Sequence, residues 1–191
     1  MANDIIATGT DIGGVIERLI TDVPAPRDTA RATAPASADA IMRAAARRAA
    51  LVSGSLALPP GPLGVATVLP DLYLIWKIQR QMVADLFAVH GRTGELTRTH
   101  MLYCLFRHAA SQVLRDVAVR AGERVVVREM TAGALRGALS TLGVTVTQRV
   151  AGATAGRFVP ALGAAAVAGY AYWDTLQVAK SAHRLLVPPA N

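Results

Sequence analysis

Three side chains with metal-binding chemistry recur at four-residue intervals near the middle of the chain. They are His100, Cys104 and His108. Residues four apart lie on one face of an α-helix, and imidazole and thiolate are ligands that zinc and similar transition metals prefer. Because positions 100 and 108 lie about 12 Å apart along a helix, one ion can take only an adjacent pair and needs further ligands from another element.

This pattern supports two hypotheses. In the first, the three residues belong to a transition-metal site, and the protein is a metal-dependent enzyme. In the second, they form a polar stripe at a helix interface, with Cys104 as a small buried filler. Gln112 and Asp116 continue the stripe at the same spacing. No C-x-x-C or H-E-x-x-H motif accompanies it, so the sequence identifies no cofactor beyond this candidate metal.

Charged side chains at the edges of two apolar segments form a second set of candidates. They are Asp71, Arg80, Arg157 and Asp174. If the two segments are helices that pack together, we expect polar contacts among these residues. A buried acid–base pair would fix the register of the helices or form part of a polar site. Asp71 has a simpler alternative, since a carboxylate in the first turn of a helix interacts favourably with the helix dipole.

Other reaction chemistries leave no signature in the sequence. There is no G-x-S-x-G motif, and the scattered Ser, His and Asp residues do not define a catalytic triad. There is no G-x-x-x-x-G-K-[ST] motif, which argues against nucleotide binding through a P-loop. The sequence therefore assigns no catalytic residue and favours a non-catalytic role.

The composition indicates a closely packed helical protein with affinity for an anionic surface. Hydrophobic residues make up 52% of the chain and charged residues only 17%. The net charge is +7; residues 1–23 carry one Arg and four acids, a net of −3, so the remainder carries +10. A basic body attracts anionic lipid or nucleic acid. Because its basic residues are scattered and no nucleic-acid motif accompanies them, lipid is favoured over nucleic acid.

Two further features bear on the compartment. Cys104 is the only cysteine, so no internal disulfide can form. The first residues, MANDIIATGTDIGG, have neither the basic region nor the long apolar stretch of a secretory signal. We therefore expect a cytoplasmic protein.

The apolar periodicity predicts an all-α fold, a compact bundle of about five helices. The first of these begins near Ser37 or Asp39 and ends before PPGPLG at 59–64, which cannot continue a helix. The others are expected at about 69–90, 96–121, 126 or 130 to 150, and 160–185. Only VVV at 125–127 gives a weak indication of a strand.

A short amphipathic helix precedes this bundle. Its apolar positions, at helical spacing, are Ile12, Val15, Ile16, Leu19 and Ile20. The segment PAPRDTARATAPAS is typical of a linker. The chain is thus divided into an N-terminal helix (1–23), a linker (24–37) and a helical domain (38–187). The N-terminal helix either docks on a protein partner, or folds back onto the domain or contacts another copy of the chain.

Two uncharged runs raise the question of a membrane span. The run at 49–70 contains PPGP, and the run at 158–173 is short and rich in Ala. Because a spanning helix needs about 20 predominantly apolar residues, neither run qualifies. Seating at a bilayer interface and burial in a bundle core remain as interpretations.

Two blocks taken together resemble the EcsC family. GPLGVATVLPDLYLIWKIQRQMVADLFAVHG, at 61–91, is similar to the family's Gly-Pro-rich turn and following helix. GRFVPALGAAAVAGYAYWDT, at 156–175, is similar to its Ala/Gly-rich signature helix, which ends near an Asn or Asp. The resemblance covers about residues 40–186. Related sequences often place the acid before the proline, whereas Pro70 precedes Asp71 here.

The resemblance implies a helical, membrane-associated accessory protein, in a family named after a component encoded with an ABC transporter and lacking a defined activity. The leading hypothesis is therefore a non-catalytic module that binds membrane or lipid on the inner face of the membrane, together with a protein partner. The alternatives are a soluble oligomeric scaffold that docks through its N-terminal helix, and the metal-dependent enzyme described above.

Overall fold

The described part of the chain is predominantly helical. The computed structural model describes residues 12–27, 37–57, 68–108, 114, 118–121, 124–127, 129–153 and 160–187. Its elements are α2 (Ile12–Thr21), α4 (Ala38–Leu56), α6 (Val68–Val89), the 3-10 turn η2 (Thr93–Glu95), α7 (Arg98–Phe106), β1 (Ala118–Ala121), β2 (Arg124–Val127), α8 (Ala132–Ala153) and α9 (Pro160–Leu186). Within these ranges six α-helices, one of them the short N-terminal helix, confirm the all-α prediction.

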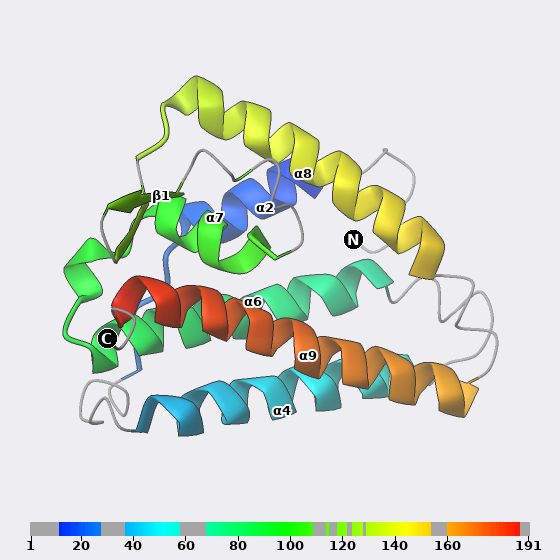
Figure 1. Ribbon diagram of the computed structural model, residues 1–191. Coiled ribbons are helices and arrows are strands. Elements are labelled where there is room, and N and C mark those ends of the chain that lie inside the picture. Colours follow the sequence, from blue (N-terminus) through cyan, green and yellow to red (C-terminus); the bar gives the residue numbers. More distant parts are fainter. Residues whose placement is uncertain are drawn as a thin grey trace.

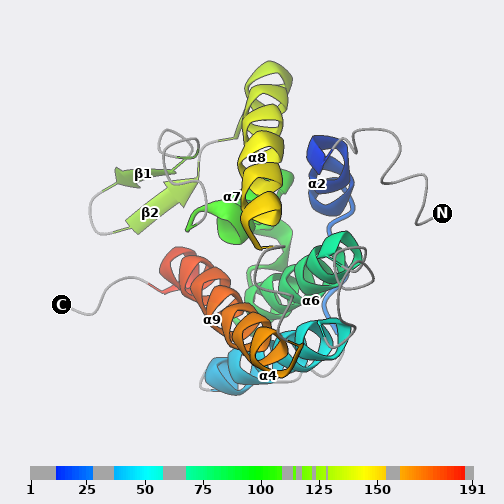
Figure 2. The same ribbon diagram turned by 90° about the vertical axis from the view of Figure 1, so that its right-hand side faces the viewer.

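The helices form two layers (Figure 1). In the lower layer of that view, α4, α6 and α9 pack against one another. The upper layer contains α2, α7 and α8, with the β1–β2 hairpin at its edge (Figure 2). The main hydrophobic core lies between the layers and includes Phe87 of α6, Leu102 and Phe106 of α7, and Leu142 of α8.

Small side chains allow α4 and α9 to lie very close together. The buried positions of α4 are Ala38, Ala45, Ala46, Ala49 and Ser53. A Cβ built on Gly54 would lie 3.2 Å from the Cβ of Ala168, closer than almost all carbon contacts of this kind. The Ala-rich composition of the two segments thus sets their separation, since larger residues would hold the backbones further apart.

The N-terminal helix is folded back onto the body of the protein. α2 contacts α8, α7 and α6. Ile16, Leu19 and Ile20 are at most 2% exposed and belong to the main core, and Val15 packs against it. The side chain of Ile12 and residues 28–36 of the expected linker lie outside the described residues. Of the alternatives drawn from the sequence, the structure has the helix folded back on its own chain.

The expected helix at 96–121 is too long. Thr97 caps the start of α7, its hydroxyl accepting a hydrogen bond from the backbone N–H of His100, and the helix ends at Phe106. Farther along, β1 pairs with β2 in antiparallel register, with Ala118 opposite Val127. The β-branched run at 125–127 favours a strand, and pairing with 118–121 satisfies backbone groups that the predicted helix would have used.

The described helices were compared with the requirements for a membrane span. In those ranges no helix combines the length and the apolar character needed to cross a bilayer.

Candidate functional site

The structure gives His100, Cys104 and His108 three separate environments. His100 Nδ1 lies 2.8 Å from the hydroxyl of Thr97, and its ring meets Phe87 edge-on. Burial lowers the pKa of His100, partly offset by the charges of Glu129 and Glu95. Since α7 ends at Phe106, His108 lies beyond the helix on which the predicted stripe was drawn.

No metal site emerges from these residues. In the described part of the chain, no group of three or more His, Cys, Asp or Glu side chains is arranged to hold a metal ion. Cys104 is also fully buried, and its desolvation raises the pKa of the thiol well above its usual range. The thiolate is the form that binds metal, so a buried protonated thiol favours the filler interpretation.

Cys104 therefore resists thiol reagents in the folded protein. We expect no reaction with a maleimide or with Ellman's reagent under native conditions, and complete reaction of one thiol in denaturing urea. Because Cys104 is the only cysteine, the readout is unambiguous. Rapid stoichiometric labelling of the folded protein would contradict the buried position.

His108 instead pairs with Asp174 in a polar cluster between helices. His108 Nε2 lies 2.7 Å from Asp174 Oδ1, and Gln79 Nε2 donates to Asp174 Oδ2 at 2.7 Å. Gln79 also lies 3.3 Å from the hydroxyl of Thr175. Because an ionised carboxylate only accepts, Nε2 is the imidazole nitrogen that carries a proton. The cluster joins α6, α9 and the chain that follows α7.

This His–Asp pair resembles part of a hydrolytic triad, and no described residue supplies the nucleophile. In such triads, the imidazole nitrogen that does not face the acid contacts a nucleophile. Within the described residues, His108 Nδ1 has no hydrogen-bond partner. The contacts of Asp174 with His108 and Gln79 form a polar bridge between elements, and a bridge of this kind fixes helix register.

The predicted contacts between the two signature helices are only partly as expected. Asp174 does meet α6, but through Gln79 rather than Arg80. Asp71 is buried against α4, where it accepts a hydrogen bond from the Ser53 hydroxyl at 2.9 Å. Arg157 lies outside the described residues.

Arg80 holds the end of α2. Its guanidinium donates to the backbone oxygens of Leu19 and Asp22, at 3.2 and 2.9 Å, and pairs with the Asp22 carboxylate. A cation is favourable at the C-terminal end of a helix, where carbonyl groups lack partners. The residue thus connects α6 to the N-terminal helix.

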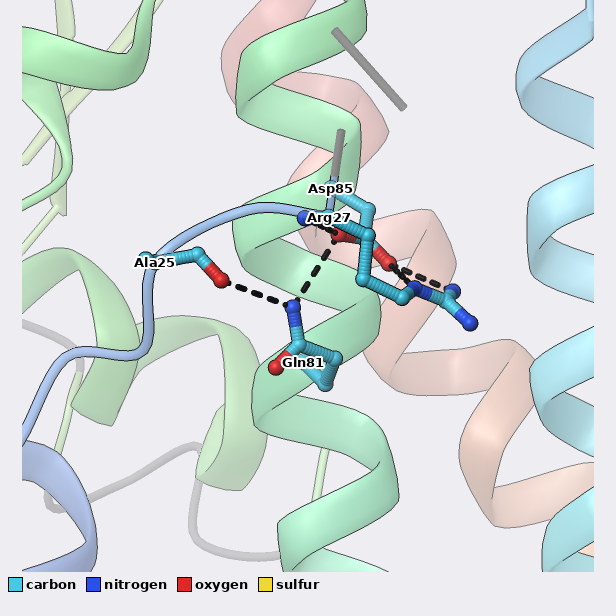
Figure 3. A network of polar contacts seen from close by, with 4 residues as sticks. All are labelled: Ala25, Arg27, Gln81 and Asp85. Carbon is cyan, nitrogen blue, oxygen red and sulfur yellow. Dashed lines mark hydrogen bonds and ion pairs between the residues drawn. The ribbon is translucent and has the colours of Figure 1, made fainter. Parts of the chain in front are cut away.

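A second connection lies five residues farther along α6, at Asp85 (Figure 3). This carboxylate is fully buried and accepts hydrogen bonds from the backbone N–H and the Nε of Arg27, at 2.9 and 2.7 Å. Gln81 donates to the same carboxylate and to the Ala25 carbonyl. Figure 3 shows the guanidinium of Arg27 on the side of α6 that faces α4.

A groove of about 320 Å³ lies between α4 and α6 beside Arg27. Its lining residues are Arg27, Ala44, Ala45, Arg48, Val52, Leu74, Lys77, Ile78, Gln81 and Met82. The volume is at the small end of the range for ligand pockets. Apolar walls that also carry the cationic residues Arg27, Arg48 and Lys77 suit a molecule that is both anionic and partly apolar.

Exposed basic and apolar side chains occur on both of these helices. We call this set the α4–α6 face; it consists of Arg43, Arg47, Arg48, Leu51, Tyr73, Leu74 and Lys77. Leu51 is 74% exposed, Tyr73 42% and Leu74 38%. The ammonium of Lys77 lies 5.5 Å from the centre of the Tyr73 ring.

Acidic side chains are scarce on this face. α4 contains only Asp39, in its first turn, and both acids of α6, Asp71 and Asp85, are buried. No ion pair joins the four basic residues of the α4–α6 face to any residue within the described ranges. All four basic side chains are exposed.

The α6 part of this face follows a helical spacing that is visible in the sequence, although it lies on the solvent side and not on the core side. In α6, exposed residues recur at Pro70, Tyr73, Leu74 and Lys77. That i, i+3, i+4, i+7 spacing defines one stripe of a helix. A stripe that mixes apolar and basic residues on the solvent side differs from an ordinary soluble surface, where large apolar residues are scattered singly.

Comparison with protein-family models, with curated protein sequences and with solved structures gives no match for this chain.

Proposed function

We propose that the protein is a non-catalytic accessory module that binds peripherally to an anionic membrane through the α4–α6 face. The observation that carries this proposal is the combination of four basic residues and three exposed apolar side chains on that face, without exposed acids beyond Asp39. The inner leaflet of a cell membrane carries the negative surface potential that such a face would meet. This supports a position on the cytoplasmic side.

Two physical contributions would act together in this binding. Each basic residue near an anionic bilayer contributes about 1 kcal/mol, a contribution that salt weakens. Leu51, Tyr73 and Leu74 would enter the headgroup region and contribute apolar burial that salt does not weaken. Tyrosine suits this depth because its ring is apolar and its hydroxyl is polar.

The resemblance to EcsC proteins accords with this proposal, because that family is membrane-associated and accessory in character. α6 belongs to the first block of the resemblance and α9, which supports α4 from behind, belongs to the second. The N-terminal helix is less suited to docking a partner, since Ile16, Leu19 and Ile20 are used in the protein's own core.

Co-sedimentation with vesicles tests the proposal. The protein should sediment with vesicles of phosphatidylserine and phosphatidylcholine and not with phosphatidylcholine alone. Arg43→Gln with Arg47→Gln should weaken binding about 30-fold, at about 1 kcal/mol per charge. Leu51→Ser should remove most of the binding that persists in high salt.

The matched control removes two positive charges from the opposite layer, through Arg98→Gln with Arg136→Gln. Both residues are exposed and lie on α7 and α8, away from α4 (Figure 1). This variant should bind nearly as well as the unmodified protein. Absence of binding at low salt, or an equal loss in the control, would overturn the proposal.

A further inference from the structure

The two helices that flank the groove run antiparallel, and this brings two cations to the same level. The hydrogen bond between Ser53 and Asp71 fixes the register at one end. Arg48 lies five residues before Ser53, about 7.5 Å along α4, and Lys77 lies six residues after Asp71, about 9 Å along α6. The two cations therefore lie on opposite sides of the groove at nearly the same height.

Apolar side chains occupy the groove on both sides of this level. Val52 and Leu74 lie toward the Ser53–Asp71 end, and Ala44, Ala45, Ile78 and Met82 lie between the cations and the other end. Ala44 is eight residues before Val52, so the lining extends about 12 Å along α4. The groove is thus elongated and mainly apolar, and Arg48 and Lys77 lie at one level of it.

The far end of the groove adds little net charge. Arg27 lines it, but its guanidinium is paired with the buried Asp85 carboxylate. Gln81 also lines it, and its amide nitrogen is already committed to Asp85 and Ala25. Arg48 and Lys77 are therefore the groove cations that have no ion-pair partner among the described residues.

We propose that this groove binds one anionic membrane lipid, with the phosphate between Arg48 and Lys77 and one acyl chain along the apolar lining. The inference rests on the proposed membrane association and assigns it a specific ligand. Two cations facing one another suit a phosphate, whose oxygens accept several charge-assisted hydrogen bonds. A neutral sugar headgroup would leave both cations without a charged partner, and a carboxylate has two acceptor oxygens, fewer than a phosphate monoester.

Isothermal titration with octyl phosphate tests the assignment without a bilayer. This probe joins a phosphate monoester to one short alkyl chain and is used below its micelle concentration. We expect binding of one molecule per chain. Inorganic phosphate and octyl glucoside, which each present half of the ligand, should bind at least about tenfold more weakly, because each lacks one of the two kinds of contact.

Two pairs of substitutions on the same helices separate the groove from the outer surface. Arg48→Gln with Lys77→Gln should weaken octyl phosphate binding by about tenfold or more, and Arg48→Lys with Lys77→Arg should restore it. Arg43→Gln with Arg47→Gln removes the same charge outside the groove and should leave octyl phosphate binding unchanged. Arg43, Arg47, Arg48 and Lys77 are all exposed, so each variant should fold; circular dichroism checks this.

The outcomes distinguish the two proposals. If vesicle binding is present and octyl phosphate binds without regard to Arg48 and Lys77, or does not bind, the groove assignment is overturned and the peripheral association stands. If inorganic phosphate binds as tightly as octyl phosphate, the lipid assignment is overturned in favour of a simple anion site. Loss of vesicle binding in all conditions overturns the proposed function on which the assignment rests.

Discussion

Arg27→Ala destabilises the fold by about 3 kcal/mol, because it leaves the carboxylate of Asp85 buried without its cation. Asp85 is 0% exposed, whereas the side chain of Arg27 is 46% exposed. The two residues are therefore not equivalent. A free Arg27 can turn into water, but Asp85 has no such alternative.

Urea unfolding of the unmodified protein and three variants measures this asymmetry. Arg27→Ala should lower the free energy of unfolding most, and Arg27→Ala combined with Asp85→Asn should recover a large part of the loss, because the buried charge is removed. Arg43→Ala, an exposed arginine on α4, is the control and should stay within about 0.5 kcal/mol of the unmodified protein. A double variant less stable than Arg27→Ala alone would contradict this account of Asp85.

Gly54→Leu is expected to have an effect of similar size, for a different reason. The first carbon of the new side chain already lies 3.2 Å from Ala168, and three further carbons must fit where α4 and α9 meet. Overpacking of this kind costs about 3 kcal/mol, and the helices must separate to relieve it.

Gly137→Leu on α8 provides the matched control. Apart from its chain neighbours and the backbone of its own helix, nothing described lies within 4 Å of a Cβ built at Gly137, so leucine has room there. Because leucine is a better helix former than glycine, this variant should be more stable by about 0.5–1 kcal/mol. Thermal unfolding should therefore shift in opposite directions for the same chemical change. A similar shift at both positions would contradict the close approach of α4 and α9.

The helices that follow strong local signals were predictable from the sequence. α9 begins at Pro160, as expected, because proline suits the first turn of a helix. α4 and α6 lie within a few residues of their predicted bounds because apolar periodicity and the PPGP break mark them. The β1–β2 hairpin was not predicted, because the helix that ends at Phe106 was expected to continue to residue 121. In the structure, residues 118–121 pair instead with the β-branched segment at 124–127.

The polar partners could not be predicted in the same way. Asp174 was expected to meet a base of α6, yet Gln79 and His108 are its partners. Nothing in the sequence singles out Asp85. In the structure its carboxylate accepts hydrogen bonds from Arg27 and Gln81 and so connects α6 to the segment that follows α2. Sequence spacing shows which residues share a helix face, but the choice between neighbouring polar groups depends on distances of an ångström or less. The groove could not be predicted from the sequence either, because it is formed by the packing of α4 against α6.

The attachment of α2 has a consequence for the order of events during protein synthesis. α2 leaves the ribosome before the residues that hold it, since Arg80 bonds Leu19 from 61 positions later and α8 follows later still. A helix of ten residues is unstable on its own in water. Until α6 has been made, Ile16, Leu19 and Ile20 therefore remain uncovered on the nascent chain, in a segment available to chaperones. The first helix of the described residues is thus among the last to acquire its final surroundings.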